Sequence, residues 1–88
     1  MYKLYSTGIF QRRAKSFLKR HPELESVLIE TLDIIICDPF ASTLKAHKLT
    51  GRLKNHWAIS LTREYRILFI IEKDNVYLTN IGSHDEIY

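Results

Sequence analysis

The residues with the clearest chemical potential are a cation, an imidazole and a phenol near the C-terminal end of the sequence. Arg66 interrupts the apolar stretch Tyr65 to Phe69, which otherwise has the composition of a buried strand. A second apolar segment ends at Gly82, and His84 and Tyr88 follow it. We expect the two segments to be neighbouring parts of one sheet. A guanidinium, an imidazole and a phenol are the group types that bind and cleave a phosphodiester.

A cation inside an apolar strand needs a partner, because burying an unpaired charge is costly. One interpretation of Arg66 is structural, an ion pair with Glu64, Glu72 or Asp85. The other is functional, because the planar guanidinium matches the oxygen atoms of a phosphate. His84 also has two interpretations. It is either a surface histidine beside Asp85 or a general acid or base, since an imidazole titrates near neutral pH.

A second basic group lies ahead of these strands. His47 stands between Lys45 and Lys48, and Lys54 follows shortly afterwards. The segment is either a solvated loop or a surface that follows a phosphate backbone. In the second case, His47 would supply a further proton-transfer group.

The remaining candidates are aromatic residues and scattered histidines. Trp57 and Tyr65 are typical of a protein core, and such rings also stack on RNA bases. The histidines show no spacing typical of a metal site, and the sequence contains neither a glycine-rich phosphate loop nor a serine-nucleophile motif. We therefore expect a site that uses no metal ion and no cofactor.

The length of the chain predicts the number of domains, and its net charge indicates the kind of partner. The 88 residues predict one domain, residues 1–88, and the net charge of +3 favours an anionic partner, either nucleic acid or an acidic polypeptide. The alternative is a merely soluble, slightly basic protein. Cys37, the only cysteine, follows three isoleucines, which predicts a buried thiol in a reducing cytoplasm. No apolar run approaches the about 18 residues of a membrane helix, so no membrane contact is expected.

Local patterns predict the elements that position these side chains. Tyr2 to Tyr5 is expected to form a strand, and Thr7 to cap a helix that ends at His21-Pro22. Pro22 suits the first position of a second helix, and Asp38-Pro39 ends it. The pattern then changes to strands, which we expect around 57–61, over 65–71 and over 76–81, with a turn at 74–75. The sequence thus predicts an α+β fold, with an N-terminal strand and a helical hairpin packed on a small twisted antiparallel sheet.

Several short motifs follow one another in an order that resembles a known family. The motifs are Asp38-Pro39, His47-Lys48-Leu49-Thr50-Gly51, Trp57, Leu61, Tyr65-Arg66-Ile67-Leu68-Phe69 and Ile81-Gly82-Ser83-His84-Asp85-Glu86-Ile87-Tyr88. Across essentially the whole chain they resemble the RelE/ParE toxin superfamily, in particular the YafQ-like branch of bacterial type II toxin–antitoxin systems. The resemblance implies a microbial-ribonuclease-like fold. It also implies a toxin that cleaves mRNA in the ribosomal A site and is neutralised by a cognate antitoxin.

The resemblance extends to individual site residues. His47 matches the histidine before the Leu-x-Gly of the YafQ-like branch, and His84 matches the terminal histidine of that branch. Arg66 matches the strand arginine of RelE-like toxins, and Tyr88 resembles their C-terminal tyrosine. We expect Arg66 to stabilise the negative charge that develops on the phosphorane, and His84 and His47 to transfer protons. Tyr88 is expected to assist the reaction or to stack on the RNA. The residues expected to bind RNA are Lys45, Lys48, Lys54, Trp57 and Tyr65.

The sequence also departs from the patterns of these toxins. Ala58 and Ser60 stand where RelE has lysines, and the acidic residue before the strand aromatic is Glu64. A histidine near Ser60 and an arginine near Asn80, both typical of YafQ-like toxins, are absent. Two alternatives therefore stay open: a ParE-like toxin that inhibits DNA gyrase by protein binding, and an inert or antitoxin-bound scaffold whose catalytic set has decayed.

Overall fold

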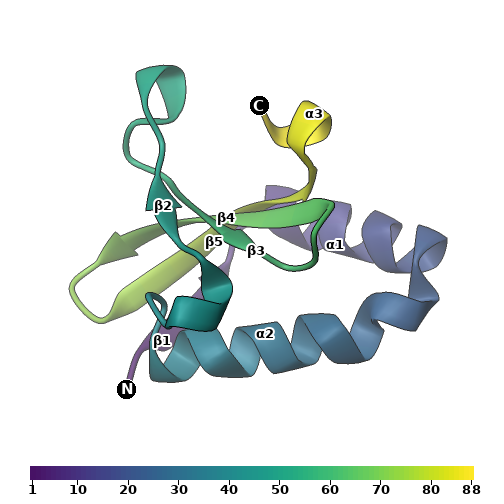
Figure 1. Ribbon diagram of the computed structural model, residues 1–88, viewed down its shortest axis with the longest axis horizontal. Coiled ribbons are helices and arrows are strands. Elements are labelled where there is room, and N and C mark those ends of the chain that lie inside the picture. The colour runs from purple at the N-terminus through teal and green to yellow at the C-terminus, as the bar shows by residue number, and fades with distance from the viewer.

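One five-stranded sheet and two long helices build most of the molecule (Figure 1). The computed structural model describes all residues, 1–88. The strands are β1 (Lys3–Ser6), β2 (His47–Lys48), β3 (Trp57–Ser60), β4 (Tyr65–Glu72) and β5 (Asn75–Ser83). The helices are α1 (Gly8–Arg20), α2 (Glu25–Cys37) and the short α3 (His84–Ile87), with 3-10 turns at Pro22–Leu24, Ser42–Leu44 and Gly51–Leu53. None of the helices has the length and apolar character needed to cross a membrane.

The strands lie in the order β1-β5-β4-β3-β2, so β4 is central. Neighbours from β2 to β5 are antiparallel, as predicted, and β4 joins β5 through Lys73-Asp74, one residue earlier than expected. β1 departs from the prediction because it runs parallel to β5, with Lys3 opposite Asn75 and Ser6 opposite Leu78. A tight turn forces two strands to be antiparallel, whereas β1 is separated from the rest of the sheet by two helices and is free of that constraint.

Both long helices cover the same face of the sheet and bury the main core against it. Thr7 caps α1 as predicted, because its Oγ1 accepts a hydrogen bond from the Phe10 N–H at 3.2 Å. Asp38 leaves α2 in an extended conformation directly before Pro39, as predicted. The core residues on the helices are Phe10, Phe17, Leu28 and Ile35, and those on the strands include Ile59, Ile67, Phe69, Val76, Leu78 and Ile81.

The prediction of a buried Cys37 thiol is wrong, because this side chain is exposed. Ile35 lies two residues earlier on α2 and is fully buried. Two residues on a helix turn the side chain by about 200°, which carries it to the opposite side. The three isoleucines before Cys37 therefore do not share one face, and their apolar character says nothing about the burial of the residue that follows.

A second, smaller apolar cluster lies on the other face of the sheet. It consists of Ala58, Leu68 and Ile87, with Leu49 and Leu53 packed against it. Strands β3 and β4 are thus buried on both faces at this end, where α3 and the segment after β2 cover them (Figure 1). The space left between these two coverings is the candidate functional site.

Candidate functional site

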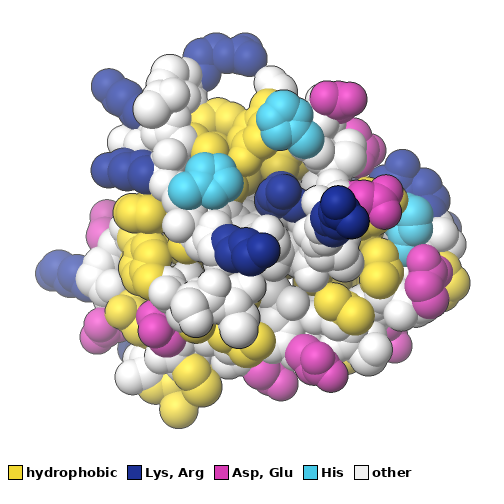
Figure 2. Space-filling model, viewed as in Figure 1, with side chains coloured by type: hydrophobic (Ala, Val, Ile, Leu, Met, Phe, Trp, Pro, Cys, Tyr) yellow, Lys and Arg dark blue, Asp and Glu magenta, His cyan; other side chains and the backbone are white.

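A cavity of about 410 Å³ opens between the segment after β2 and α3. Its lining residues are His47, Leu49, Thr50, Arg52, Leu53, Arg66, His84 and Tyr88. Figure 2 shows histidine and basic side chains around an apolar patch on this face. The four residues predicted to be catalytic come from β2, β4 and the C-terminal segment, and the fold brings them all to this one cavity.

The strand alternation explains why these side chains share a face. His47 lies opposite Ala58 in the β2–β3 pairing, and Ala58 lies opposite Leu68 in the β3–β4 pairing. Arg66 is two residues from Leu68 on β4 and therefore points to the same side of the sheet. This is the side that carries the second apolar cluster, so His47 and Arg66 stand beside it.

Arg66 has no acidic partner. Its Nη1 donates hydrogen bonds to the backbone oxygens of Thr62 at 3.1 Å, Arg63 at 3.1 Å and Tyr65 at 3.2 Å. None of the ion pairs in the structure includes Arg66, so the interpretation of Arg66 as one partner of an ion pair is wrong. Neutral carbonyl groups orient the guanidinium without cancelling its charge. The cation at the cavity is thus able to bind an anion.

α3 places the imidazole and the phenol together. Residues four apart meet on a helix, and the rings of His84 and Tyr88 contact edge to face, with centroids 4.4 Å apart. The Tyr88 N–H donates to the His84 oxygen at 3.1 Å. His84 Nδ1 also lies 3.5 Å from Asp85 Oδ1, but the His84 side chain is 74% exposed and the carboxylate is fully exposed. Such a surface pair contributes little to stability.

Two residues in the C-terminal segment, Tyr88 and Glu86, have shifted pKa values. Burial raises the pKa of the Tyr88 phenol, and the nearby Arg66 charge opposes this only partly. The phenol therefore stays neutral at neutral pH and is a hydrogen-bond donor. The backbone N–H of Ser83 is the main cause of a lowered pKa at Glu86, followed by the Ser83 side chain, with the charges of Arg20 and Arg13 acting in the same direction. Glu86 is therefore ionised at neutral pH.

The two aromatic residues expected to bind RNA do not lie at the cavity. Trp57 packs edge to face on Phe40, with ring centroids 4.8 Å apart. Tyr65 packs on Phe17 at 4.9 Å. Both rings contact the main core on the helix-covered side, because alternation along each strand points them opposite to Arg66. Their placement favours core packing, the other interpretation of these rings.

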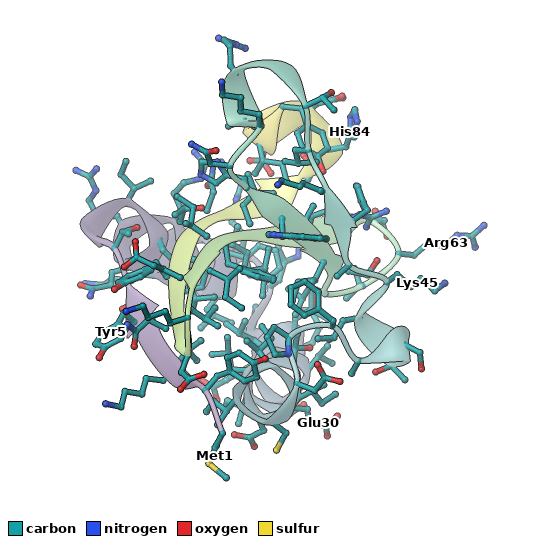
Figure 3. All side chains as sticks on the ribbon, turned by 90° about the vertical axis from the view of Figure 1, so that its left-hand side faces the viewer. Met1, Tyr5, Glu30, Lys45, Arg63 and His84 are labelled. Atoms are coloured by element: carbon teal, nitrogen blue, oxygen red, sulfur yellow. The ribbon has the colours of Figure 1, made fainter.

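The predicted basic residues do not line the cavity. Lys45, Lys48 and Lys54 are exposed, and Lys48 Nζ lies 6.0 Å from the Trp57 ring centroid. Figure 3 shows Lys45 extending away from the molecule, apart from His84. The cation that does line the cavity beside Arg66 is Arg52, which was not predicted.

A signal for Arg52 was present in the sequence. Arg52 follows Gly51 in the same basic segment as Lys54. Gly51 has φ of +70°, a left-handed conformation that residues with a side chain rarely adopt. The glycine thus allows the turn Gly51–Leu53, and this turn brings Arg52 to the rim of the cavity.

The remaining histidines lie elsewhere. His21, at the end of α1, has its Nε2 3.1 Å from the Tyr65 hydroxyl, and the His56 side chain is partly buried ahead of β3. No three His, Cys, Asp or Glu side chains gather closely enough to hold a metal ion. The polar side chains of the cavity are thus two guanidinium groups, two imidazoles, one phenol and the Thr50 hydroxyl.

Solved structures share this architecture over the whole chain. YafQ from Escherichia coli strain BL21(DE3) superposes with a TM-score of 0.86 at 16% identity, covering 100% of this chain and 99% of that one. A metal-bound toxin from Helicobacter pylori gives 0.84 at 24% identity, with both chains covered completely. YafQ in the DinJ–YafQ complex of E. coli gives 0.75 at 18% identity, with coverage of 100% and 99%. These similarities confirm the predicted RelE-like α+β fold.

Sequence comparison identifies the family to which the chain belongs. A search of curated proteins found no match. The family model described as the bacterial toxin of type II toxin–antitoxin system, YafQ, matches residues 2–88. The chain therefore belongs to the YafQ family of bacterial toxins of type II toxin–antitoxin systems.

Proposed function

We propose that this toxin is a metal-independent endoribonuclease that cleaves mRNA in the ribosomal A site, in the cytoplasm. The main support is the meeting of His47, Arg66, His84 and Tyr88 at one cavity of about 410 Å³. These residues come from three separate segments of the chain, and their groups are those that phosphodiester cleavage requires. Membership of the YafQ family agrees with this activity.

The reaction begins at the RNA itself. The 2′-hydroxyl attacks the adjacent phosphorus, while a base takes its proton; His47 is suited to this role. Arg66 and Arg52 stabilise the negative charge that develops on the phosphorane oxygens. His84 donates a proton to the departing 5′ oxygen. The products are a 2′,3′-cyclic phosphate and a free 5′-hydroxyl, and the neutral Tyr88 phenol donates a hydrogen bond or stacks on a base.

The ribosome is expected to complete the site. In the free protein, His47 and His84 are both exposed, and His84 is 74% exposed. Exposed side chains sample many orientations, so the final alignment of the two imidazoles is reached only when RNA binds. Holding the reacting groups in place contributes a large part of catalysis. Cleavage of naked RNA should accordingly be much slower than cleavage of ribosome-bound mRNA.

The function is tested by mapping mRNA 5′ ends in cells that express the toxin. We expect new 5′ ends with hydroxyl termini, together with arrest of translation. Cells expressing Arg66→Ala at the same level are the control and should lack these ends. Intact mRNA accompanied by DNA damage would contradict the proposal and point to gyrase as the target.

The protein partner of a type II toxin is a cognate antitoxin, and the DinJ–YafQ complex shows such an assembly for a related fold. We predict that the antitoxin of this toxin covers the cavity with an acidic segment that folds on binding. Arg52 and Arg66 line the cavity and the net charge of the protein is +3, so the surface attracts negative charge.

A structure of the complex checks this prediction, together with RNA cleavage measured before and after antitoxin is added. The cavity should be filled and cleavage should stop. A complex that leaves the cavity open, and leaves the path to the ribosome free, would show that neutralisation works differently.

A further inference from the structure

The helix that carries His84 and Tyr88 is only one turn long, His84–Ile87. A helix of this length has no stability of its own in water, so contacts with the rest of the protein must hold it. One such contact is apolar, because Ile87 is 6% exposed and packs with Ala58 and Leu68. A single side chain allows the turn to tilt and fray, so the orientation of the two ring-bearing residues depends on what else holds α3.

Glu86 supplies a second set of contacts, on the side facing α1. Its Oε1 accepts a hydrogen bond from the Ser83 N–H at 2.8 Å, which closes a capping box at the start of α3. Its Oε2 lies 3.6 Å from Arg20 Nη2. Arg20 belongs to α1, so a single carboxylate both caps α3 and joins it to a long helix.

Arg13 attaches the same helix to the strand that leads into α3. Its Nε donates to the Ile81 oxygen at 3.3 Å. The parallel pairing of β1 ends at Leu78, so this oxygen lies on the part of β5 that β1 does not reach. Arg13 and Arg20 are seven residues apart, two helical turns, and share one face of α1. α1 therefore contacts both sides of the junction between β5 and α3.

The junction itself is tightly packed. A Cβ atom added at Gly82 would lie 3.1 Å from Glu86 Oε1 and 3.3 Å from Arg13 Nη2. Glu86 and both arginines also line a small cleft of about 150 Å³. Figure 1 shows the end of β5 passing α1 before the chain enters α3, in agreement with the contacts between these elements.

We propose that Arg13, Arg20 and Glu86 form a clamp that holds α3 in the orientation that aims His84 and Tyr88 into the cavity. They are positioning residues, since none of them lines the cavity itself. The effect of the clamp on cleavage rests on the proposed function. Its effect on the orientation of α3 does not, because that orientation is measurable without RNA. The ion pair alone is exposed and weak. The clamp works because the same carboxylate also accepts the hydrogen bond from the Ser83 N–H and thus joins the start of α3 to α1.

The clamp predicts a specific kinetic signature. Arg66 and Arg52, which would bind the phosphate, belong to β4 and to the turn Gly51–Leu53, so loosening α3 leaves them in place. Substrate affinity should persist while proton transfer becomes slower. We expect Glu86→Ala to lower kcat about tenfold, with KM within about twofold of wild type, because misaligned catalytic groups cost rate rather than binding.

The experiment uses the full chain and two readouts. The first is cleavage of mRNA bound in the ribosomal A site, expressed per folded molecule. The second is the nuclear Overhauser contact between the Ile87 and Leu68 side chains, which joins α3 to the sheet and therefore reports how α3 is placed. Glu86→Ala should lose this contact together with the kcat decrease. Glu86→Gln keeps an oxygen that accepts from the Ser83 N–H and should restore part of both. Glu72→Gln, an exposed carboxylate at the far end of β4, should change neither.

Arg20→Ala provides a milder variant that keeps the capping box, with the neighbouring exposed Lys19→Ala as its control. It should weaken the contact between Ile87 and Leu68 and lower kcat by a few fold, whereas Lys19→Ala should match wild type. Folded Glu86→Ala and Arg20→Ala proteins that keep this contact and the wild-type kcat would overturn the clamp. If the wild type cleaves no RNA, the proposed nuclease function fails, and the contact between Ile87 and Leu68 alone then decides whether the clamp exists.

Discussion

Arg66→Ala is expected to abolish toxicity while the fold survives. Removing a preorganised charge donor typically lowers a catalytic rate by about 10²–10³-fold. The fold should tolerate the change because Arg66 neutralises no carboxylate. Its hydrogen bonds go to backbone oxygens, those of Thr62 and Arg63 in the turn before β4 and that of Tyr65 at the start of β4. All three residues are at least partly exposed, so water is able to replace the guanidinium.

The measurement combines growth arrest in expressing cells with single-turnover cleavage and circular dichroism of the purified protein. Arg63→Ala is the matched control, because Arg63 is an exposed arginine of the same turn and extends into solvent (Figure 3). Its side chain does not line the cavity, so toxicity should be retained. A folded, well-expressed Arg66→Ala protein that still arrests growth would exclude Arg66 from the mechanism.

His84→Gln is expected to lower cleavage by about 10²–10⁴-fold, the usual contribution of a general acid. Glutamine retains a hydrogen-bonding side chain of similar length but cannot donate a proton to the leaving oxygen. Because the His84 side chain is 74% exposed and its ion-pair partner is also exposed, replacing it should leave folding intact. Binding to the ribosome and the antitoxin should persist, since neither depends mainly on one exposed imidazole.

Single-turnover cleavage of A-site mRNA by folded wild type and His84→Gln checks this expectation. A variant that cleaves within a few fold of wild type would transfer the acid role to His47 or Tyr88. A variant that fails to fold would show that the histidine is structural. Ribosome binding measured on the same two proteins separates a loss of chemistry from a loss of contact.

Local patterns in the sequence determined most of the elements. Thr7 begins α1 and Asp38-Pro39 ends α2 because capping and proline geometry act over a few residues. The long apolar run of β4 and its partner β5 were predictable because strands buried on both faces need such composition. The sequence also determined the residue types of the site, since His47, Arg66, His84 and Tyr88 stand in the motif order of a toxin superfamily.

Only the tertiary structure decided which of these side chains meet. Alternation along β3 and β4 separates Trp57 and Tyr65 from Arg66, but the local pattern does not say which face the helices cover. The parallel direction of β1 and the place of Arg52 at the cavity likewise depend on how distant segments pack. Arg13 contacts Ile81 across 68 residues of sequence, a separation at which no local periodicity operates. The sequence by itself thus determined the elements and the reactive groups. Packing between remote segments decided their arrangement, because such contacts depend on three-dimensional proximity rather than on spacing along the chain.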